Sequence, residues 1–481
     1  MSTLAGDGAV IRAETVVELL ERSTSTIIEA DGGARQCADV LEAGRSLAAD
    51  LAAAGVEPGD RIAIQMANEP TYLELLVAAA VGGFVVMSVN LRFADALADS
   101  LIERSGARMV IRSASDLPAR ARDPKGVPGP DSADDHYVIF TTSGTTSAPK
   151  LVVHGQRSIA AHAGDVAAAF GYGPDSVVLV PLPLCGVFGF TVVFGALAGN
   201  ATLILPSAFE ADATAAIIEE HAVTSLHGSD DMFHRLLETD RDLSSIESSG
   251  YARFNSALDG IVERCDARGI PLSGLYGMSE VQALFAWRGG VGRSIGERWR
   301  PAGPLVSPQA QCRVVDDELQ LQGPSLFAGY LADGGSEIDR ELTDRHFDGP
   351  WFRTGDLAVE DGPRSFEYIT RMGDAMRLGG FLVAPTEIEG VLLGVDGIEQ
   401  AQVVAAGTDR GTRPVAFVIT DGTALDESAA IAHCGETLAR FKCPVRVVPV
   451  DAFPVTDGPN GVKIQRTELR RRAEALLAIS D

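Results

Sequence analysis

Lysine is scarce in this chain of 481 residues. Only four of its 40 basic residues are lysine, and the others are arginine; the four are Lys125, Lys150, Lys442 and Lys463. A lysine ammonium is a compact point charge on a flexible stem, which suits contact with phosphate or with a developing oxyanion. These positions are therefore candidates for such contacts. The alternative is that a coding bias towards arginine left them by chance.

Positive charge as a whole is also in short supply, because 66 acidic residues give a formal net charge of −26. A field of that sign repels nucleic acid and anionic membrane, so neither is an expected partner. It would repel any polyphosphate ligand as well, unless a local site supplied positive charge. Hydrophobic residues make up 46% of the chain, which is enough for a large buried core and argues against disorder.

Paired cysteines and a leader segment are both missing. The six cysteines are scattered and form no Cys-x-x-Cys pair; they are Cys37, Cys185, Cys265, Cys312, Cys434 and Cys443. Neither a disulfide framework nor a zinc site is indicated, and a reducing cytoplasm fits this usage. The first residues, MSTLAGDGAVIRAE, lack the apolar core of a signal peptide. We therefore expect a cytoplasmic protein.

Charged residues are absent from 176–209, a stretch long enough to cross a membrane. Prolines at 181 and 183, glycines at 186, 189, 195 and 199, and an asparagine at 200 divide it into short pieces. The pattern predicts a strand, a small apolar helix around 190–197 and a second strand. A buried β-α-β unit is therefore expected rather than a membrane span.

Elsewhere in the first 300 residues, short apolar strands alternate with helical patterns. RIAIQM at 61–66 and FVVMSV at 84–89 flank a predicted helix at 71–83, for example. Such alternation predicts an α/β domain with largely parallel strands and crossover helices. After about residue 300 the strands become short and alternating, which predicts a small antiparallel or barrel-like piece. We place a boundary near Asp374, with a large domain over 1–373 and a smaller α+β domain over 374–481.

The stretch TTSGTTSAPK at 141–150 follows a predicted strand and is rich in small hydroxyl residues. Such a loop can present backbone N–H groups and hydroxyls to phosphate oxygens, with Lys150 adding a cation. It is not a Walker A loop, because only Gly144 is present and Leu151 follows the lysine. Its composition alone fits a phosphate cradle and a polar surface turn equally well.

Three later motifs each place one polar side chain beside a turn. LYGMSE at 275–280 carries Glu280, which would matter if a phosphate-bound Mg²⁺ lay nearby. WFRTGDL at 351–357 carries Asp356, which could accept both hydroxyls of a ribose. FPVTDGPNGVKIQRTELR at 453–470 carries Lys463 after a glycine-rich loop. Each alone is equally typical of an ordinary turn residue.

The order of the motifs resembles the adenylate-forming superfamily, in its branch of acyl-CoA synthetases and other AMP-binding enzymes. TTSGTTSAPK is similar to the family's Thr-Ser-Gly-Thr-Thr-Gly-x-Pro-Lys, and LYGMSE to its Tyr-Gly-x-Thr-Glu. DELQLQGPSLFAGY at 317–330 resembles Gly-Glu-Leu-x-x-x-Gly-Pro-x-x-x-x-Gly-Tyr. RTGD, the segment TRMGDAMRLGGFLVAPTEIE at 370–389 and KIQR at 463–466 follow in family order. The matches span residues 141–466.

The resemblance implies a two-step ligase. ATP and a carboxylic acid would give an acyl-adenylate and pyrophosphate, with Mg²⁺, and the adenylate would pass to the thiol of coenzyme A. It also implies a large N-terminal domain of parallel α/β sheets with a small β-barrel-like piece, and a mobile C-terminal lid. That lid would rotate about Asp374 between the two steps.

The resemblance assigns roles to individual residues. The nucleotide would be held by Thr142, Ser143, Gly144, Thr145, Thr146, Lys150, Tyr276, Gly277, Ser279, Asp356 and Arg371. Within that set the threonine-rich loop would hold phosphates, Tyr276 would stack on adenine, and Asp356 with Arg371 would hold the ribose. Glu280 would bind Mg²⁺, and Lys463 would place an ammonium at the reacting carboxylate and α-phosphate. Gly379 and Gly380 would border a tunnel for the pantetheine arm.

The sequence departs from the family pattern at three places, one of which bears on the substrate. Ser147 replaces the second glycine of the phosphate loop. PLPLCGVFGF at 181–190 carries Cys185-Gly186 where relatives often have Phe-His, and the last glycine is one residue further from Lys463 than usual. We predict a roomy apolar acyl pocket, formed by Leu184, Phe188, His227, Gly228, Gly277 and Met278. The stretch PLPLCGVFGF also lacks the aspartate with which amino-acid-activating relatives bind the substrate ammonium. The resemblance therefore disfavours an α-amino acid as the substrate.

The leading hypothesis is an ATP-dependent ligase that joins a bulky apolar or aryl carboxylic acid to coenzyme A. The first alternative is a stand-alone adenylating enzyme that passes its product to a carrier-protein thiol or to a separate transferase. A carrier domain is not visible in the sequence, so a carrier would be a separate protein. The second alternative is an inactive nucleotide-binding relative, which the altered phosphate loop alone favours. An oligomer is compatible with the sequence.

Overall fold

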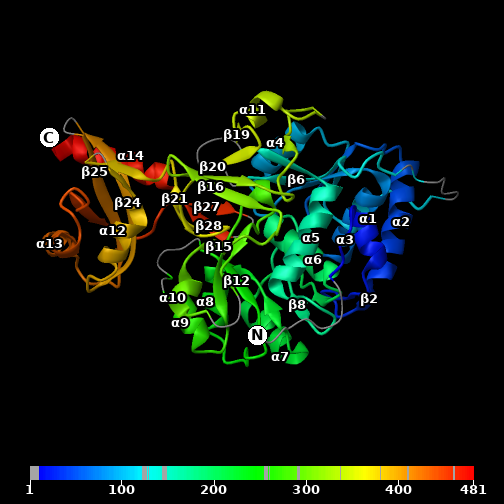
Figure 1. Cartoon of the computed structure of the whole chain (residues 1–481), viewed down its shortest axis with the longest axis horizontal. Helices are drawn as coiled ribbons and strands as arrows, with labels where there is room; N and C mark the ends of the chain where they lie inside the picture. The colour runs from blue at the N-terminus through cyan, green and yellow to red at the C-terminus, as the bar shows by residue number, and fades with distance from the viewer. Residues whose placement is uncertain are drawn as a thin grey trace.

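The computed structural model describes residues 10–121, 127, 129–142, 149–253, 258, 260–289, 293–335, 337–379, 381–408, 411–458 and 461–480. For residues 408, 456–458, 461–463, 479 and 480 the description is of the backbone alone. Most of the chain forms one large body, and most of the residues after about 375 form a smaller lobe, drawn at the left in Figure 1; the strands at 455–458 and 461–464 are drawn over the large body in this view. Within the described residues, no helix combines the length and apolar character needed to cross a bilayer.

A six-stranded sheet lies at the heart of the large body, in the order β18-β7-β6-β4-β3-β5. Its strands are β3 (Arg61–Ile64), β4 (Val85–Ser88), β5 (Met109–Ile111), β6 (His136–Thr141), β7 (Leu151–Gly155) and β18 (Gly329–Tyr330). The first four pair in parallel, whereas β7 and β18 run antiparallel to their neighbours. Three helices belong to this part, α2 (Cys37–Ala53), α3 (Pro70–Gly82) and α4 (Asp95–Ser105). Helix α3 begins with proline at its first position and is capped at its C-terminus by Gly83, whose φ of 67° suits glycine.

A five-stranded sheet, in the order β10-β8-β9-β1-β2, packs beside the first sheet. Its elements are α1 (Val16–Arg22), β1 (Thr26–Ile28), β2 (Ala34–Gln36), α5 (Gln156–Phe170), β8 (Val177–Leu179), α6 (Val187–Ala198), β9 (Thr202–Ile204), α7 (Ala211–His221) and β10 (Ser225–Leu226). Strands β8 and β9 are parallel, and every residue of the connecting α6 is buried. The prediction of a buried β-α-β unit at 176–209 is therefore confirmed.

A four-stranded sheet, in the order β11-β12-β13-β14, completes the α/β part. Its elements are β11 (Gly228–Ser229), α8 (Asp230–Leu236), β12 (Ser249–Ala252), α9 (Ile261–Asp266), β13 (Leu272–Tyr276), the short 3-10 helix η3 (Ser279–Val281), β14 (Ala286–Trp287) and α10 (Ile295–Trp299). Strands β11, β12 and β13 are parallel. The predicted α/β architecture with largely parallel strands is confirmed.

The antiparallel piece expected after residue 300 is a six-stranded sheet, β15-β21-β20-β17-β16 with β19 paired to β20. Its elements are β15 (Ala302–Pro304), β16 (Gln311–Val315), β17 (Glu318–Gln322), α11 (Arg340–Asp344), β19 (Phe347–Asp348), β20 (Trp351–Gly362) and β21 (Ser365–Arg371). Its pairings are antiparallel throughout. The register places Asp356 opposite Arg371, so two motifs that the sequence separates become neighbours.

The C-terminal lobe has its own apolar core, built around Val403, Ala416 and Val418. Its elements are β22 (Met376–Leu378), β23 (Phe381–Val383), α12 (Pro385–Leu392), β24 (Ile398–Thr408), β25 (Gly411–Thr420), α13 (Glu427–Thr437), β26 (Arg446–Pro449), β27 (Val455–Gly458), β28 (Gly461–Ile464) and α14 (Arg466–Ser480). Arg470 on α14 donates a hydrogen bond to the carbonyl of Gly373, at 3.1 Å, beside the expected hinge. The boundary at 373/374 stays a prediction, and the separate core supports it.

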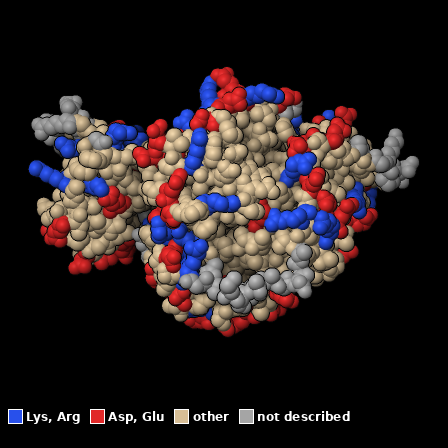
Figure 2. All heavy atoms as spheres, viewed as in Figure 1, with Lys and Arg blue, Asp and Glu red and all other residues tan. Residues whose placement is uncertain are grey.

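Charges of both signs are mixed over the surface seen in Figure 2. Acidic side chains lie among the arginines around the rim of this face and on the C-terminal lobe, without a continuous basic surface. This face therefore offers no continuous basic surface of the kind that a polyphosphate would need in a chain of net charge −26.

Candidate active site

The two ends of the predicted phosphate loop are hydrogen-bonded to each other, between the end of β6 and the start of β7. The N–H of Thr142 donates to the carbonyl of Lys150, and the N–H of Lys150 donates to Thr142 Oγ1, both at 3.0 Å. Arg104 from α4 also donates to the Pro149 carbonyl, at 2.8 Å. Five predicted loop residues, Ser143, Gly144, Thr145, Thr146 and Ser147, lie outside the described residues. The hydrogen bonds at the two ends of the loop nevertheless fix the backbone position from which the Lys150 side chain extends into the site.

Lys150 lies against a tyrosine and a histidine from distant parts of the chain. Its Nζ is 2.8 Å from His346 Nε2 and 4.5 Å from the centre of the Tyr330 ring. Burial lowers the pKa of Lys150, while the nearby Glu280 opposes that shift. The ammonium is therefore partly desolvated, which strengthens its attraction for an anion.

Glu280 is held in a buried position directly after β13. It is 8% exposed, and its Oε1 accepts a hydrogen bond from the Tyr330 hydroxyl at 2.8 Å. The turn before it requires glycine, because a Cβ on Gly277 would lie 1.8 Å from the Ala283 carbonyl oxygen. Ser279 ties this turn to the central sheet: its hydroxyl donates to the Thr141 carbonyl at 3.3 Å. Its carbonyl accepts from His154 Nε2 at 2.8 Å.

His154 is neutral at pH 7, which allows this contact in the protein interior. Burial lowers the pKa of His154 to about 4. Because the Ser279 carbonyl can only accept, Nε2 must carry the ring proton. The buried imidazole therefore acts as a fixed donor that positions the turn carrying Glu280.

Asp356 is buried against Tyr276 and forms an ion pair with the half-exposed Arg371. The Tyr276 hydroxyl donates to Asp356 Oδ2 at 2.6 Å, and Arg371 Nε lies 3.0 Å from Oδ1. That N–H is not directed at Oδ1, so among the described residues Oδ1 has no hydrogen-bond donor. Burial raises the pKa of Asp356, and the Arg371 charge and the Tyr276 hydroxyl oppose the rise. A buried carboxylate oxygen without a donor is a suitable acceptor for a sugar hydroxyl.

The turn that presents Asp356 is fixed by a second carboxylate. Glu318 on β17 accepts a hydrogen bond from the Gly355 N–H at 3.0 Å and pairs with Arg353 at 2.9 Å. Gly355 has φ of 70°, a conformation that side chains other than glycine rarely adopt. The turn is therefore set by a glycine conformation and by a carboxylate from another strand.

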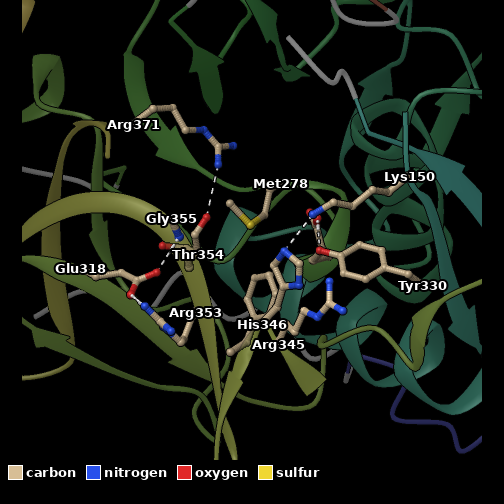
Figure 3. Close-up of a pocket in the computed structure, with 12 residues that line it drawn as sticks. Lys150, Met278, Glu318, Tyr330, Arg345, His346, Arg353, Thr354, Gly355 and Arg371 are labelled. Carbon is tan, nitrogen blue, oxygen red and sulfur yellow. Dashed lines mark hydrogen bonds and ion pairs between the residues drawn. The ribbon is translucent and has the colours of Figure 1, made fainter. Parts of the chain in front are cut away.

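These groups surround a single cavity of about 320 Å³, shown in Figure 3. Its lining is Lys150, Met278, Glu280, Glu318, Tyr330, Arg345, His346, Phe352, Arg353, Thr354, Gly355 and Arg371. Lys150 and His346 point toward one another on one side of it, and Arg371 reaches in from the opposite side. Four cationic side chains and two carboxylates line it; Arg345, Arg353 and Arg371 each also pair with a carboxylate, whereas Lys150 faces His346 and Tyr330.

The residues present fit a magnesium ion held jointly by the protein and a phosphate group. Across the described ranges, no group of three or more His, Cys, Asp or Glu could bind a metal without other ligands. Glu280 is a single buried carboxylate at the edge of the cationic cavity. Mg²⁺ commonly takes one or two protein carboxylates and completes its shell with phosphate oxygens and water. These residues therefore do not form a metal site made of protein ligands alone.

The predicted acyl-pocket residues fall into two groups. Leu184 and Phe188 belong to the large apolar core, and the Leu184 N–H donates to Asn68 Oδ1 at 2.8 Å. Met278 instead lines the cavity, and Gly277, which precedes it in the chain, is exposed. Burial raises the pKa of Cys185 to about 12, so this neighbour of Leu184 is an apolar thiol. The pocket stays a prediction.

His227 and Gly228, the remaining two residues of that set, are packed in the interior. The His227 ring stacks on Phe170 with a centroid distance of 3.8 Å. Its Nδ1 accepts from the Gly250 N–H and its Nε2 pairs with the Ser225 hydroxyl, both at 2.9 Å. Burial lowers the pKa of His227 to about 3. Both nitrogens are engaged, so the ring can offer only its apolar surface to a substrate.

The predicted lid residues lie in or beside the C-terminal lobe. Asp374 follows β21 and its N–H donates to the Arg371 carbonyl at 3.0 Å. Gly379 has φ of 57° and faces the Phe441 ring, whereas Gly380 lies outside the described residues. Lys463 lies on β28, where its backbone pairs with Thr456; its side chain is not among those described. The placement of its ammonium therefore stays a prediction.

Several cavity residues were not predicted from the sequence. Tyr330 and Glu318 lie within a quoted motif, but their contacts with Glu280 and Gly355 depend on strands that meet only in the fold. His346 belongs to none of the quoted motifs and is 196 residues from Lys150. In the sequence, a histidine between a short helix and a short strand does not by itself indicate a functional residue.

Comparisons with known proteins agree with this geometry. A family model described as AMP-binding enzyme matches residues 22–331, and one described as AMP-binding enzyme C-terminal domain matches residues 387–457. A feruloyl-CoA synthase of Amycolatopsis sp is 29% identical, covering 93% of this chain and 96% of the relative. The 3-[(3aS,4S,7aS)-7a-methyl-1,5-dioxo-octahydro-1H-inden-4-yl]propanoyl:CoA ligase of Mycobacterium tuberculosis is 30% identical, covering 88% and 91%.

The fold is also that of a solved structure. ATP-bound MatB from Rhodopseudomonas palustris superposes with a TM-score of 0.83 at 22% identity, covering 97% of this chain and all of that one. The resemblance stated from the ordered motifs is confirmed: the chain belongs to the AMP-binding enzyme family, whose members form acyl-adenylates.

Proposed function

We propose that this protein is an AMP-forming acid–thiol ligase. It joins ATP and a bulky apolar or aryl carboxylic acid to give an acyl-adenylate and pyrophosphate, and then transfers the acyl group to the thiol of coenzyme A with release of AMP. One observation carries the proposal: motifs at 150, 280 and 356 meet around one cationic cavity, beside a buried Asp356 oxygen that lacks a donor. A nucleotide offers both the phosphates and the sugar hydroxyls that such a cavity suits.

Asp356 would hold the ribose. Its Oδ2 is already committed to Tyr276, so Oδ1 remains for the sugar hydroxyls, and Arg371 keeps the carboxylate charged. The ring of Tyr276 is enclosed by Phe366 and Tyr368, with centroids 5.0 and 5.7 Å away. Adenine would lie against this aromatic group, with Gly277 and Ser279 alongside.

The phosphates would lie toward Lys150 and Glu280. Thr142 and the loop residues 143–146 would offer hydroxyls and N–H groups, and Lys150 would add an ammonium at the end of the loop. Mg²⁺, bound by Glu280 together with phosphate oxygens, would reduce the repulsion between the nucleotide and the incoming carboxylate. This chain's own contribution is to hold Glu280 in place through Tyr330 and through the Ser279 carbonyl.

Lys463 would complete the first step from the C-terminal lobe. An ammonium placed at the acid carboxylate and α-phosphate stabilises the charge that develops as the phosphorus–oxygen bond forms. For the second step the lobe would turn about Asp374 and bring Gly379 and Gly380 beside the pantetheine arm. The separate core of the lobe supports movement as a unit.

The acid is expected to be large and apolar. Leu184 and Phe188 lie in an apolar core, and the thiol of Cys185 is buried beside them. The two relatives act on an aryl acid and on a polycyclic propanoic acid, by their names, and both names specify coenzyme A as the acceptor. These names favour coenzyme A over a carrier-protein thiol.

The test is a two-stage assay on the purified chain. ATP–pyrophosphate exchange with cinnamic, benzoic, medium-chain fatty and polycyclic acids is expected to proceed, and exchange with amino acids is not. Adding coenzyme A should give an acyl-CoA, identified by mass, with one AMP per thioester. Exchange without thioester would move the assignment to the carrier-protein alternative, and exchange with amino acids alone would overturn the substrate class.

A further inference from the structure

Lys150 is held by a histidine that lies outside every motif of the site. His346 lies between α11 and β19, and its Nε2 is 2.8 Å from Lys150 Nζ. Both side chains line the cavity, and Figure 3 shows them pointing toward one another. The contact therefore joins the end of the phosphate loop to the antiparallel sheet.

The direction of the hydrogen bond follows from the other ring nitrogen. His346 Nδ1 is 2.9 Å from the Leu342 carbonyl oxygen, which can only accept. Nδ1 therefore donates to that carbonyl, and the contact of Nε2 with an ammonium requires a lone pair on Nε2. The Lys150 ammonium donates to that lone pair.

An aromatic ring fixes the same ammonium from a second side. Lys150 Nζ lies 4.5 Å from the Tyr330 ring centre, and the His346 ring meets Tyr330 edge-on at 5.1 Å. The Tyr330 hydroxyl points elsewhere, to Glu280 Oε1 at 2.8 Å. Imidazole and phenol together define one location for the ammonium.

This location keeps Lys150 apart from the nearest acidic group of the site. Glu280 attracts the ammonium, and Arg371 repels it. Yet within the part of the chain that the structure describes, no carboxylate lies within ion-pair distance of Lys150 Nζ. A flexible lysine beside a buried carboxylate would ordinarily pair with it, because each charge lowers the cost of burying the other. His346 supplies a competing acceptor.

We propose that His346 is a positioning residue that holds the Lys150 ammonium away from Glu280. Lys150 stays available to phosphate oxygens, and Glu280 stays available to a divalent cation. The inference rests on the proposed function for its consequence in catalysis, but the position of Lys150 can be tested without turnover.

The matched variants are His346→Asn and His346→Gln. The glutamine amide oxygen reaches about as far as Nε2 and can accept from Lys150. The shorter asparagine amide can still donate to the Leu342 carbonyl but does not reach the lysine. The pair therefore separates loss of the acceptor from general disturbance of the half-buried site, and thermal melting checks that both variants fold.

The direct readout is the pKa of Lys150. Reductive ¹³C-methylation labels the lysines, only four in this chain, and keeps their charge and one N–H; the Lys150→Arg variant assigns the signal. In His346→Asn the ammonium is expected to move onto Glu280, so its pKa should rise by about one unit or more. In His346→Gln it should stay within a few tenths of a unit of wild type. An unchanged or lower Lys150 pKa in His346→Asn overturns the proposal.

The kinetic readout uses the same proteins in ATP–pyrophosphate exchange. His346→Asn is expected to need roughly tenfold more Mg²⁺ for half-maximal exchange, because Lys150 then competes for Glu280, with a smaller change in kcat. Equal Mg²⁺ requirements for the two variants contradict the proposal. If wild type gives no exchange with any acid, the proposed function fails, and the Lys150 pKa still decides the role of His346.

Discussion

Replacing Tyr276 by phenylalanine tests the core of the nucleotide site with the loss of one oxygen atom. The hydroxyl donates to Asp356 Oδ2 at 2.6 Å in a buried setting, and Asp356 is only 1% exposed. A hydrogen bond to a charged group contributes roughly 1.5–3 kcal/mol, and the buried acceptor left behind cannot recover it from water. We therefore expect Tyr276→Phe to lower the free energy of unfolding by about that amount.

The same substitution should weaken ATP binding. The hydroxyl holds the pKa of Asp356 down against the rise caused by burial, and Arg371 is the other group that does so. Without the hydroxyl, Asp356 is protonated at a higher pH and is also free to rotate away from the ribose. The expected result is a KM for ATP raised roughly tenfold. The acid limb of kcat/KM for ATP should move to higher pH.

Tyr368→Phe is the matched control for this experiment. Its ring lies 5.7 Å from that of Tyr276, but among the described residues its hydroxyl makes no hydrogen bond to Asp356. Initial rates of ATP–pyrophosphate exchange from pH 5 to 9, with ATP varied, give both profiles. The reasoning is refuted if Tyr276→Phe and Tyr368→Phe have the same KM for ATP and the same acid limb.

Other parts of the site give further predictions. Gly277→Ala places a Cβ 1.8 Å from the Ala283 carbonyl oxygen, so exchange activity should fall at least tenfold and the melting temperature should drop; unchanged values contradict the account of the turn. Burial lowers the pKa of His162 to about 4, below its unfolded value, so its share of stability is present above about pH 6.5 and is lost as pH falls towards 4. Between pH 7 and 5, urea denaturation should show that the free energy of unfolding falls by about 2 kcal/mol more in wild type than in His162→Leu. Parallel pH profiles of the two proteins would exclude a contribution of His162 to the pH dependence of stability. Lys463→Ala should slow adenylate formation roughly 10²–10³-fold in single-turnover assays, and an unchanged rate removes the lysine from the first step. Lys150→Arg should impair exchange, because a planar guanidinium does not fit between His346 and Tyr330. Lys442→Arg should leave exchange unchanged, since Lys442 pairs with Glu387 at the surface. Equal effects of the two substitutions would mean that the site does not require an ammonium at position 150.

The sequence was sufficient for the fold class and for the residues that adjoining strands bring together. Strand and helix alternation predicted the parallel sheets, and the proline and glycine pattern predicted the buried unit at 176–209. Asp356 and Arg371 became neighbours because β20 and β21 form a hairpin in which the register is fixed locally. The family resemblance had placed both residues at the ribose, and the pairing between consecutive strands gives the physical reason for their proximity.

Contacts between distant segments could not be read in the same way. The hydrogen bond from Tyr330 to Glu280 requires β18 to add to the edge of the central sheet beside β7. His227 was expected to line an acyl pocket, which stays a prediction; the contacts of its two nitrogens with Ser225 and Gly250 depend on the folded sheets. A buried histidine and a substrate-facing one have the same one-letter code, and the difference lies in their neighbours.

The charge of the chain and the geometry of the site together account for the presence of a lysine at position 150. With a net charge of −26 the chain as a whole repels a nucleotide, so binding depends on cations that lie close to the ligand. Arginine alone would supply charge, and Arg345, Arg353 and Arg371 do so around the cavity. A single-point donor that fits between an imidazole and a phenol ring must be lysine, and Lys150 occupies that position. The acidic surface and a site that binds an anion are therefore compatible, because screening by water and salt weakens the attraction or repulsion from distant charges far more than that from charges in contact with the ligand.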